Sequence, residues 1–261
     1  MAGNLSRHAR VPTAFTLVET LVVVAIIALL LAILLPAVQS VRVRMKALVC
    51  ASNMRSIVFK FHLFAGGVNR EGRGDSEILG PGRFYIGDFQ ESVYRIDEFW
   101  DLPIATGLLE SQKEMMLCPA GPRTLSKQQG FPCSNAAVFP ARDVTIAMNM
   151  RLYRASLALA GSPVLAPAAV THVRSNVLGR AYVPLVMDVD GAVAADRGIE
   201  PFYTAPPLTT QNDAYADGLH WMPSKRHAGR TVVGFVGGHV LSSARPEQES
   251  WNWSYQADVG N

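Results

Sequence analysis

Residues with chemically useful side chains are sparse, and their spacing matches no common catalytic or metal-binding motif. Of six histidines, His220, His227 and His239 fall close together near the C-terminus. They lack the HExxH pattern and the paired Cys and His spacing of zinc sites. His227 and His239 are explained equally well as structural hydrogen-bond donors, so the sequence leaves open whether a metal binds in this region. No Walker A loop, nucleotide-binding glycine motif or nucleophilic serine motif indicates an enzyme.

Two aspartates and two cysteines leave alternatives open. Asp188 and Asp190 begin a segment similar to the start of a calcium-binding loop, but the other EF-hand ligand positions are missing. The two aspartates could equally form turns. A bridge between Cys118 and Cys133 would close a loop of about 15 residues and contribute roughly 3 kcal/mol. Two unpaired thiols are the alternative, whereas Cys50 is expected to be packed in the interior.

The apolar residues are concentrated in one uncharged segment near the N-terminus. Apolar residues make up 49% of the 261 residues and charged residues only 17%, which argues against a disordered chain. The run from Leu21 to Val38 contains no charge and no polar face, and is typical of a membrane-spanning helix. The basic residues Arg7 and Arg10 precede it, which favours an N-terminus in the cytoplasm. The net charge of +3 is too small to indicate a nucleic-acid partner.

Glu19 lies at the edge of this apolar segment, where an ionised carboxylate costs a few kcal/mol unless it is paired. The segment Ala14-Phe15-Thr16-Leu17-Val18-Glu19, after a basic leader and before the apolar run, resembles the processing and methylation site of type IV prepilins and of the pseudopilins of type II secretion. The resemblance implies cleavage between Ala14 and Phe15, methylation of the new amino terminus, and assembly through Phe15 and Glu19. It also implies a helix kink at Pro36. The family usually has glycine where this chain has Ala14, so slower processing is expected.

A C-terminal segment resembles a pilin-like family common in planctomycetes. In that family a histidine is followed, after nine residues, by Asp-Gly; here His227 is followed by Gly237-Gly238. We expect these two glycines to form a two-residue hairpin turn with positive φ at both positions. The segments from Cys50 to Ile57 and from Leu117 to Pro119 also resemble patterns of this family.

The sequence therefore predicts an α+β fold, in which a long N-terminal transmembrane helix packs on an antiparallel β-sheet head. The expected divisions are a leader over 1–14, a helix over 15–65 with a membrane span near 15–38, and an extracytoplasmic head over 66–261. Tyr182 to Asp188, Thr231 to Val236 and Val240 to Ser243 are expected to be strands.

The family resemblance implies a non-enzymatic structural subunit of a type IV pilus or a type II secretion pseudopilus. It would be a single-pass protein of the cytoplasmic membrane, with its head in the periplasm or outside the cell. The implied partners are prepilin peptidase, other pilin-like subunits and the inner-membrane assembly platform. No cofactor is expected, although some pseudopilins bind calcium in the head. The alternative is a signal-anchored extracytoplasmic binding or enzymatic domain. An ordinary secretory signal sequence cut after Ser40 is a separate possibility.

Overall fold

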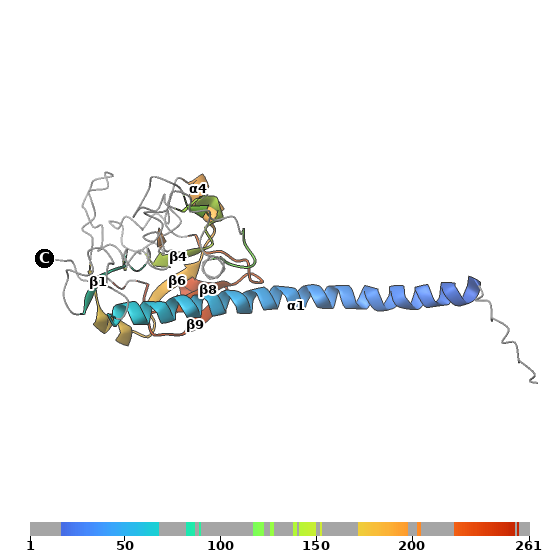
Figure 1. Ribbon diagram of the computed structural model, residues 1–261, viewed down its shortest axis with the longest axis horizontal. Helices are drawn as coiled ribbons and strands as arrows, with labels where there is room; N and C mark the ends of the chain where they lie inside the picture. The colour runs from blue at the N-terminus through green and yellow to red at the C-terminus, as the bar shows by residue number, and fades with distance from the viewer. Residues whose placement is uncertain are drawn as a thin grey trace, which may run out of the picture. The chain divides into compact units, whose positions relative to one another are not determined.

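The computed structural model describes residues 17–67, 82–86, 89, 117–122, 126–127, 138–139, 141–149, 152, 172–197, 203–204, 222–253 and 255. The chain divides into two compact units, Met1–Arg42 and Val43–Asn261. The described residues form an α+β fold with one long apolar N-terminal helix and mostly antiparallel strands (Figure 1). This confirms the predicted α+β class with its long apolar N-terminal helix and antiparallel sheets.

Helix α1 (Leu17–Ala65) carries two different kinds of surface. In the first unit, every described residue over 17–42 is exposed, and this stretch includes the apolar run. Within the described residues, α1 is the one helix long and apolar enough to cross a membrane. The helix runs through Pro36 without ending and stops at Ala65, where the N–H of Gly67 donates to the carbonyl of Phe64 at 3.0 Å.

In the second unit, α1 buries one stripe of side chains, which recur at the three-to-four spacing of a helix face. The stripe comprises Cys50, Met54, Ile57, Val58, Phe61, Phe64 and Ala65. Phe61 and Phe64 pack against Phe84 and Phe89, with ring centroids between 5.1 and 5.6 Å apart. This stripe makes the last part of α1 a component of the head's hydrophobic core.

The main sheet has five strands in the order β7-β4-β6-β8-β9. Their bounds are β4 (Ile146–Asn149), β6 (Pro184–Asp188), β7 (Tyr203–Thr204), β8 (Thr231–Phe235) and β9 (Val240–Ser243). All neighbours pair antiparallel except β4 and β7, which are parallel. The central strands β4, β6 and β8 are buried along their whole length, which explains their nearly continuous apolar sequences. The three predicted strands correspond to β6, β8 and β9.

Shorter elements surround this sheet. Two small antiparallel pairs join β1 (Arg83–Tyr85) to β5 (His172–Arg174) and β2 (Ser126–Lys127) to β3 (Val138–Phe139). The remaining elements are helix α4 (Gly191–Asp196) and the 3-10 turns η4 (Ala141–Asp143), η6 (Ser175–Gly179) and η7 (Pro246–Gln248). Asp190 caps α4 by accepting the N–H groups of Ala192 and Val193 at 3.1 and 3.2 Å.

Gly234 allows α1 to lie close to the sheet. A Cβ at this position of β8 would come within 2.9 Å of both the Val58 side chain on α1 and the Val186 side chain on β6. Figure 1 shows the last turns of α1 running along β8 and β9. The missing side chain therefore sets how closely the helix and the sheet approach each other.

The hairpin between β8 and β9 differs from the predicted two-residue turn. The N–H of Phe235 donates to the carbonyl of His239 at 2.9 Å, so the loop has three residues, Val236 to Gly238. Of the two glycines, only Gly238 has positive φ (97°). Gly237 is required for a different reason, because a Cβ there would lie 2.6 Å from Cα of Ala181. The loop matches the three-residue class, in which the last residue is left-handed.

Candidate functional site

Four buried side chains of metal-ligand type meet in the head. They are Cys50, Cys118, Asp188 and His227, and their ligand atoms all lie within 4.8 Å of one another. The Nε2 atom of His227 is 3.2 Å from Sγ of Cys118 and 3.3 Å from Oδ2 of Asp188. Both cysteines and Asp188 have no exposed surface, and His227 is 3% exposed. We call these four residues the buried cluster.

Each cysteine of the buried cluster is held by its own element. Cys50 begins the buried stripe of α1. Cys118 lies in a short turn, where its carbonyl accepts the N–H of Gly121 at 2.9 Å. The N–H of Cys118 donates to Oγ1 of the buried Thr145 at 2.8 Å, and this bond anchors the turn beside β4. The two thiols therefore come from two different segments, α1 and the turn at Cys118.

Asp188 ends β6, and Arg226 pairs with it. The guanidinium of Arg226 donates to Oδ1 of Asp188 and to the carbonyls of Val189 and Thr145. The backbone carbonyl of Asp188 accepts the N–H of Ser224 at 2.9 Å. One carboxylate oxygen is thereby fixed by a cation, while Oδ2 faces His227 and has no hydrogen-bond partner among the residues that the structure describes.

A tight turn places His227. The N–H of Arg230 donates to the carbonyl of His227 at 3.2 Å, and both central residues have positive φ, 53° at Ala228 and 79° at Gly229. Those angles define a type I′ turn, the kind that the sequence reading assigned to Gly237 and Gly238. Left-handed alanine is strained, so the backbone next to His227 holds an unfavourable conformation.

The low polarity of the core governs the charge of Asp188. Burial raises the pKa of Asp188 to about 7, against the opposing attraction of the Arg226 guanidinium. The pKa of Arg226 is itself raised: burial alone lowers it, but the neighbouring carboxylate outweighs that effect. Ionisation of the aspartate therefore depends on having cations close by.

The two cysteines differ strongly in acidity. The hydrogen bond from Cys50 lowers the pKa of Cys118 to about 4, while the same bond and burial raise the pKa of Cys50. Burial lowers the pKa of His227, but the hydrogen bond and charge of Cys118 outweigh it and raise the pKa overall. Without a metal, these pKa shifts favour a thiolate at Cys118 and a neutral thiol at Cys50, and they act on His227 toward its protonated form.

The buried cluster lacks the geometry of a nucleophilic Cys-His-Asp triad. In such a triad the histidine uses one ring nitrogen for the nucleophile and the other for the carboxylate. Here Cys118 and Asp188 both approach Nε2 of His227, and Nδ1 has no partner among the described residues. The Cys118 side chain also has no exposed surface for a substrate to reach. The chemistry that remains open to these residues is coordination of a metal or formation of a disulfide.

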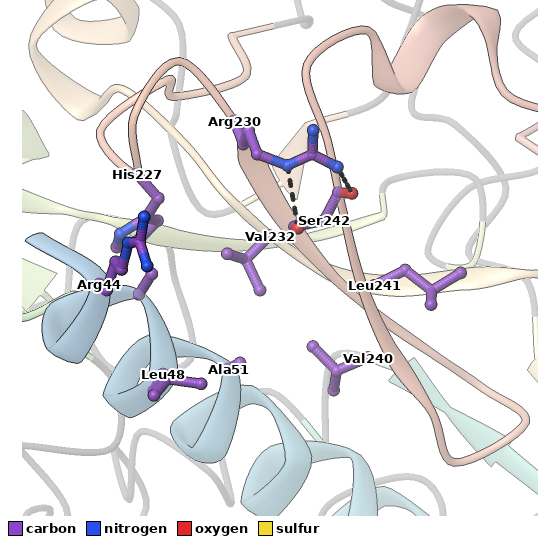
Figure 2. A pocket seen from close by; sticks show the side chains of 10 residues that line it. Arg44, Leu48, Ala51, His227, Arg230, Val232, Val240, Leu241 and Ser242 are labelled. Atoms are coloured by element: carbon purple, nitrogen blue, oxygen red, sulfur yellow. Dashed lines mark hydrogen bonds between the residues drawn. The ribbon is translucent and has the colours of Figure 1, made fainter.

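A pocket of about 420 Å³ reaches the buried cluster from outside. Figure 2 shows α1 on one side of it and the β8–β9 hairpin on the other, with His227 among the lining residues. The exposed side chains of Leu48 and Leu241 line it as well. Arg44 and Arg230 add positive charge to a mostly apolar lining. His227 therefore connects the pocket to the buried cluster.

Most other predicted site residues lie apart from this cluster. Ala14, Phe15, Cys133 and His220 fall outside the described residues, so the predicted processing site and disulfide stay predictions; Cys118 itself is a free thiol in the structure. Glu19 and Pro36 lie on α1 in the first unit. His239 stacks on Phe235, with ring centroids 4.6 Å apart. Asp188 and Asp190 have different partners, Arg226 and the first turn of α4, and we do not propose calcium there.

Sequence spacing did not reveal the buried cluster, because its members come from four separate segments. A signal was nevertheless present. Cys50, Cys118 and His227 each stand in one of the three segments that resemble the planctomycete pilin-like pattern, and the fold brings all three together. Comparisons of the chain with family models, with curated proteins and with solved structures found no significant match.

Proposed function

We propose that this protein is a pilin-like structural subunit that is cut before Phe15 and assembles into a type IV pilus or a type II secretion pseudopilus. One observation carries the proposal: α1 is a single helix whose first part is apolar and exposed, and whose last part buries one stripe of side chains in the head. An exposed apolar surface of this length requires a membrane or neighbouring subunits to cover it. The prepilin-like motif around Phe15 and Glu19 adds support from the sequence.

Charge pairing between subunits gives the assembly a physical basis. Cleavage before Phe15 creates an ammonium group near the apolar segment, and Glu19 supplies a carboxylate of opposite sign. An axial offset between stacked subunits brings Glu19 of one to the amine of the next, and head-to-tail contacts that do not close produce a filament. In this proposal the partners are prepilin peptidase, the inner-membrane assembly platform and other pilin-like subunits, and the head is exported.

The mass of the mature protein tests the processing step. We expect protein extracted from membranes to begin at Phe15 and to carry one additional methyl group. The variant Ala14→Leu should keep residues 1–14, because a bulkier side chain does not fit a peptidase site adapted to glycine or alanine. A mature chain that begins after Ser40, or cleavage of Ala14→Leu at Phe15, would refute the assignment.

The alternative is a signal-anchored extracytoplasmic binding domain, and the pocket beside His227 favours it. Its size, about 420 Å³, is within the usual range for small-ligand sites, and its lining combines apolar side chains with Arg44 and Arg230. A mature chain that keeps the apolar segment without a cut at Phe15 would support this alternative, whereas a terminus after Ser40 would indicate ordinary secretion.

A further inference from the structure

We propose that Cys50, Cys118, Asp188 and His227 bind a zinc ion that ties α1 to the sheet of the head. Zinc in structural sites takes four ligands in a tetrahedron, drawn from cysteine sulfur, histidine nitrogen and carboxylate oxygen. The buried cluster offers two sulfurs, one nitrogen and one oxygen, one from each residue. The proposed zinc site goes beyond the role of a pilin-like subunit, because it concerns how the head is held together.

The spacing of the ligand atoms fits such an ion. Zinc bonds of about 2.3 Å to sulfur and about 2.0–2.2 Å to nitrogen and oxygen place neighbouring ligand atoms roughly 3.4–3.8 Å apart. The described distances from Nε2 of His227, 3.2 Å to sulfur and 3.3 Å to oxygen, are close to these values. All the remaining ligand pairs lie within 4.8 Å. Changes of up to about 1 Å in these separations would complete the tetrahedron.

The charges of the buried cluster also fit a divalent cation. With both thiols and Asp188 ionised and His227 neutral, the ligands carry three negative charges and Arg226 contributes one positive charge. A divalent ion makes the sum zero, and uncompensated charge in a core is costly. The ion would also supply a partner for Oδ2 of Asp188, which has no hydrogen bond within the described part of the chain.

The ligand types select the metal. Thiolates are soft ligands that favour zinc over calcium and magnesium, which take oxygen ligands. The surroundings hold the ligands in place: Thr145 fixes the backbone at Cys118, and Arg226 fixes the Asp188 carboxylate through its other oxygen. Partners of this kind orient metal ligands and tune their affinity. The pocket lined by His227 gives the ion a path into the core.

A disulfide between Cys50 and Cys118 is the competing chemistry, because exported proteins meet oxidising conditions. Such a bridge would use both sulfurs, but it would leave the contact between His227 and Oδ2 of Asp188 without a function. Zinc coordination accounts for all four side chains at once. The geometry therefore favours zinc coordination. The oxidation state of the two thiols distinguishes zinc coordination from the disulfide.

The experiment uses the full-length chain purified in detergent without chelator. We expect equimolar zinc by elemental analysis, and we expect Cys50→Ser and His227→Gln to lose most of it. Cys133→Ser and His239→Gln are the matched controls, which should retain zinc. Removal of zinc with a chelator should lower the unfolding temperature, and zinc but not calcium should restore it.

A second measurement does not depend on the variants being folded. Replacing zinc by cobalt in the wild-type protein should give the thiolate-to-metal charge-transfer absorption of tetrahedral sulfur coordination. A disulfide of Cys118 with Cys50 or with Cys133 in a non-reducing peptide map, found without bound zinc, would overturn the proposal. So would a cobalt spectrum without the thiolate band, or zinc bound equally well by Cys50→Ser and His227→Gln.

Discussion

Nε2 of His227 lies 3.2 Å from Sγ of Cys118, although 109 positions separate the two residues in the chain. This contact joins the loop before β8 to the turn that follows Leu117. Hydrophobic burial has no direction of its own, so it cannot by itself fix the register between two such segments. A directional contact between buried polar groups can, and this one forms only when the two loops lie against each other.

Removing Arg226 should destabilise the head far more than removing an exposed arginine. Arg226→Met leaves Asp188, which has no exposed surface, without its cationic partner. Breaking a buried ion pair in this way typically costs about 3–5 kcal/mol. Urea unfolding of the chelated protein measures this loss without a contribution from metal.

Arg230→Met is the matched control for Arg226→Met. The Arg230 guanidinium bonds Ser242 at the exposed edge of the β8–β9 hairpin. Exposed contacts contribute about 0–1 kcal/mol, so its unfolding midpoint should stay close to that of the parent. Equal losses for the two variants would show that the Arg226–Asp188 pair is not buried as described.

Gly237 should tolerate no side chain, even though its φ is ordinary. A Cβ there would lie 2.6 Å from Cα and 2.8 Å from the carbonyl oxygen of Ala181, both backbone atoms that cannot move aside easily. We expect Gly237→Ala to cost about 1–3 kcal/mol, as overpacking usually does. Gly179→Ala is the control, since nothing lies within 4 Å of the added Cβ. An unchanged urea midpoint for Gly237→Ala would contradict the close approach to Ala181.

The sequence predicted the elements whose signals are local. The long apolar run gives the first part of α1, and short apolar runs give β6, β8 and β9. The glycine pair at 237–238 was misread, because glycine also permits close backbone approach. The type I′ turn at Ala228–Gly229 was missed, since alanine rarely begins one.

The buried cluster could not be derived from the sequence for a different reason. Metal motifs are recognisable when two ligands share one turn or one helix face, whereas these four come from α1, a turn, the end of β6 and a loop. Their proximity is a property of the packed core alone. Only the resemblance of three of those segments to one family pattern pointed in the same direction.

Relief of backbone strain beside His227 should raise stability. Ala228 has φ of 53°, a conformation that costs most L-residues roughly 1–2 kcal/mol and that asparagine adopts more readily. Ala228→Asn should therefore stabilise the protein by up to about 1 kcal/mol, seen as a higher urea midpoint with unchanged slope. Ala244→Asn, at an exposed alanine without positive φ, should give no gain. A lower midpoint for Ala228→Asn would mean that the turn has another shape.

Glu19 provides the sharpest test of assembly. It lies in the first described turn of α1, immediately before the apolar run. An ionised carboxylate at this depth is costly unless a cation compensates it, and the amine of a neighbouring Phe15 is the proposed cation. Glu19→Gln keeps the shape and removes the charge, so we expect a chain that is inserted and processed normally but forms few filaments. Loss of about 1.4 kcal/mol per contact lowers an association constant tenfold, and this loss is repeated at every subunit contact along a filament.

The yield of filaments sheared from cells and the mass of the membrane-extracted chain are the two measurements. Glu247→Gln, in η7 of the head, is the control and should assemble as the parent does. Normal filament yield from Glu19→Gln, with processing intact, would rule out charge pairing as the basis of assembly.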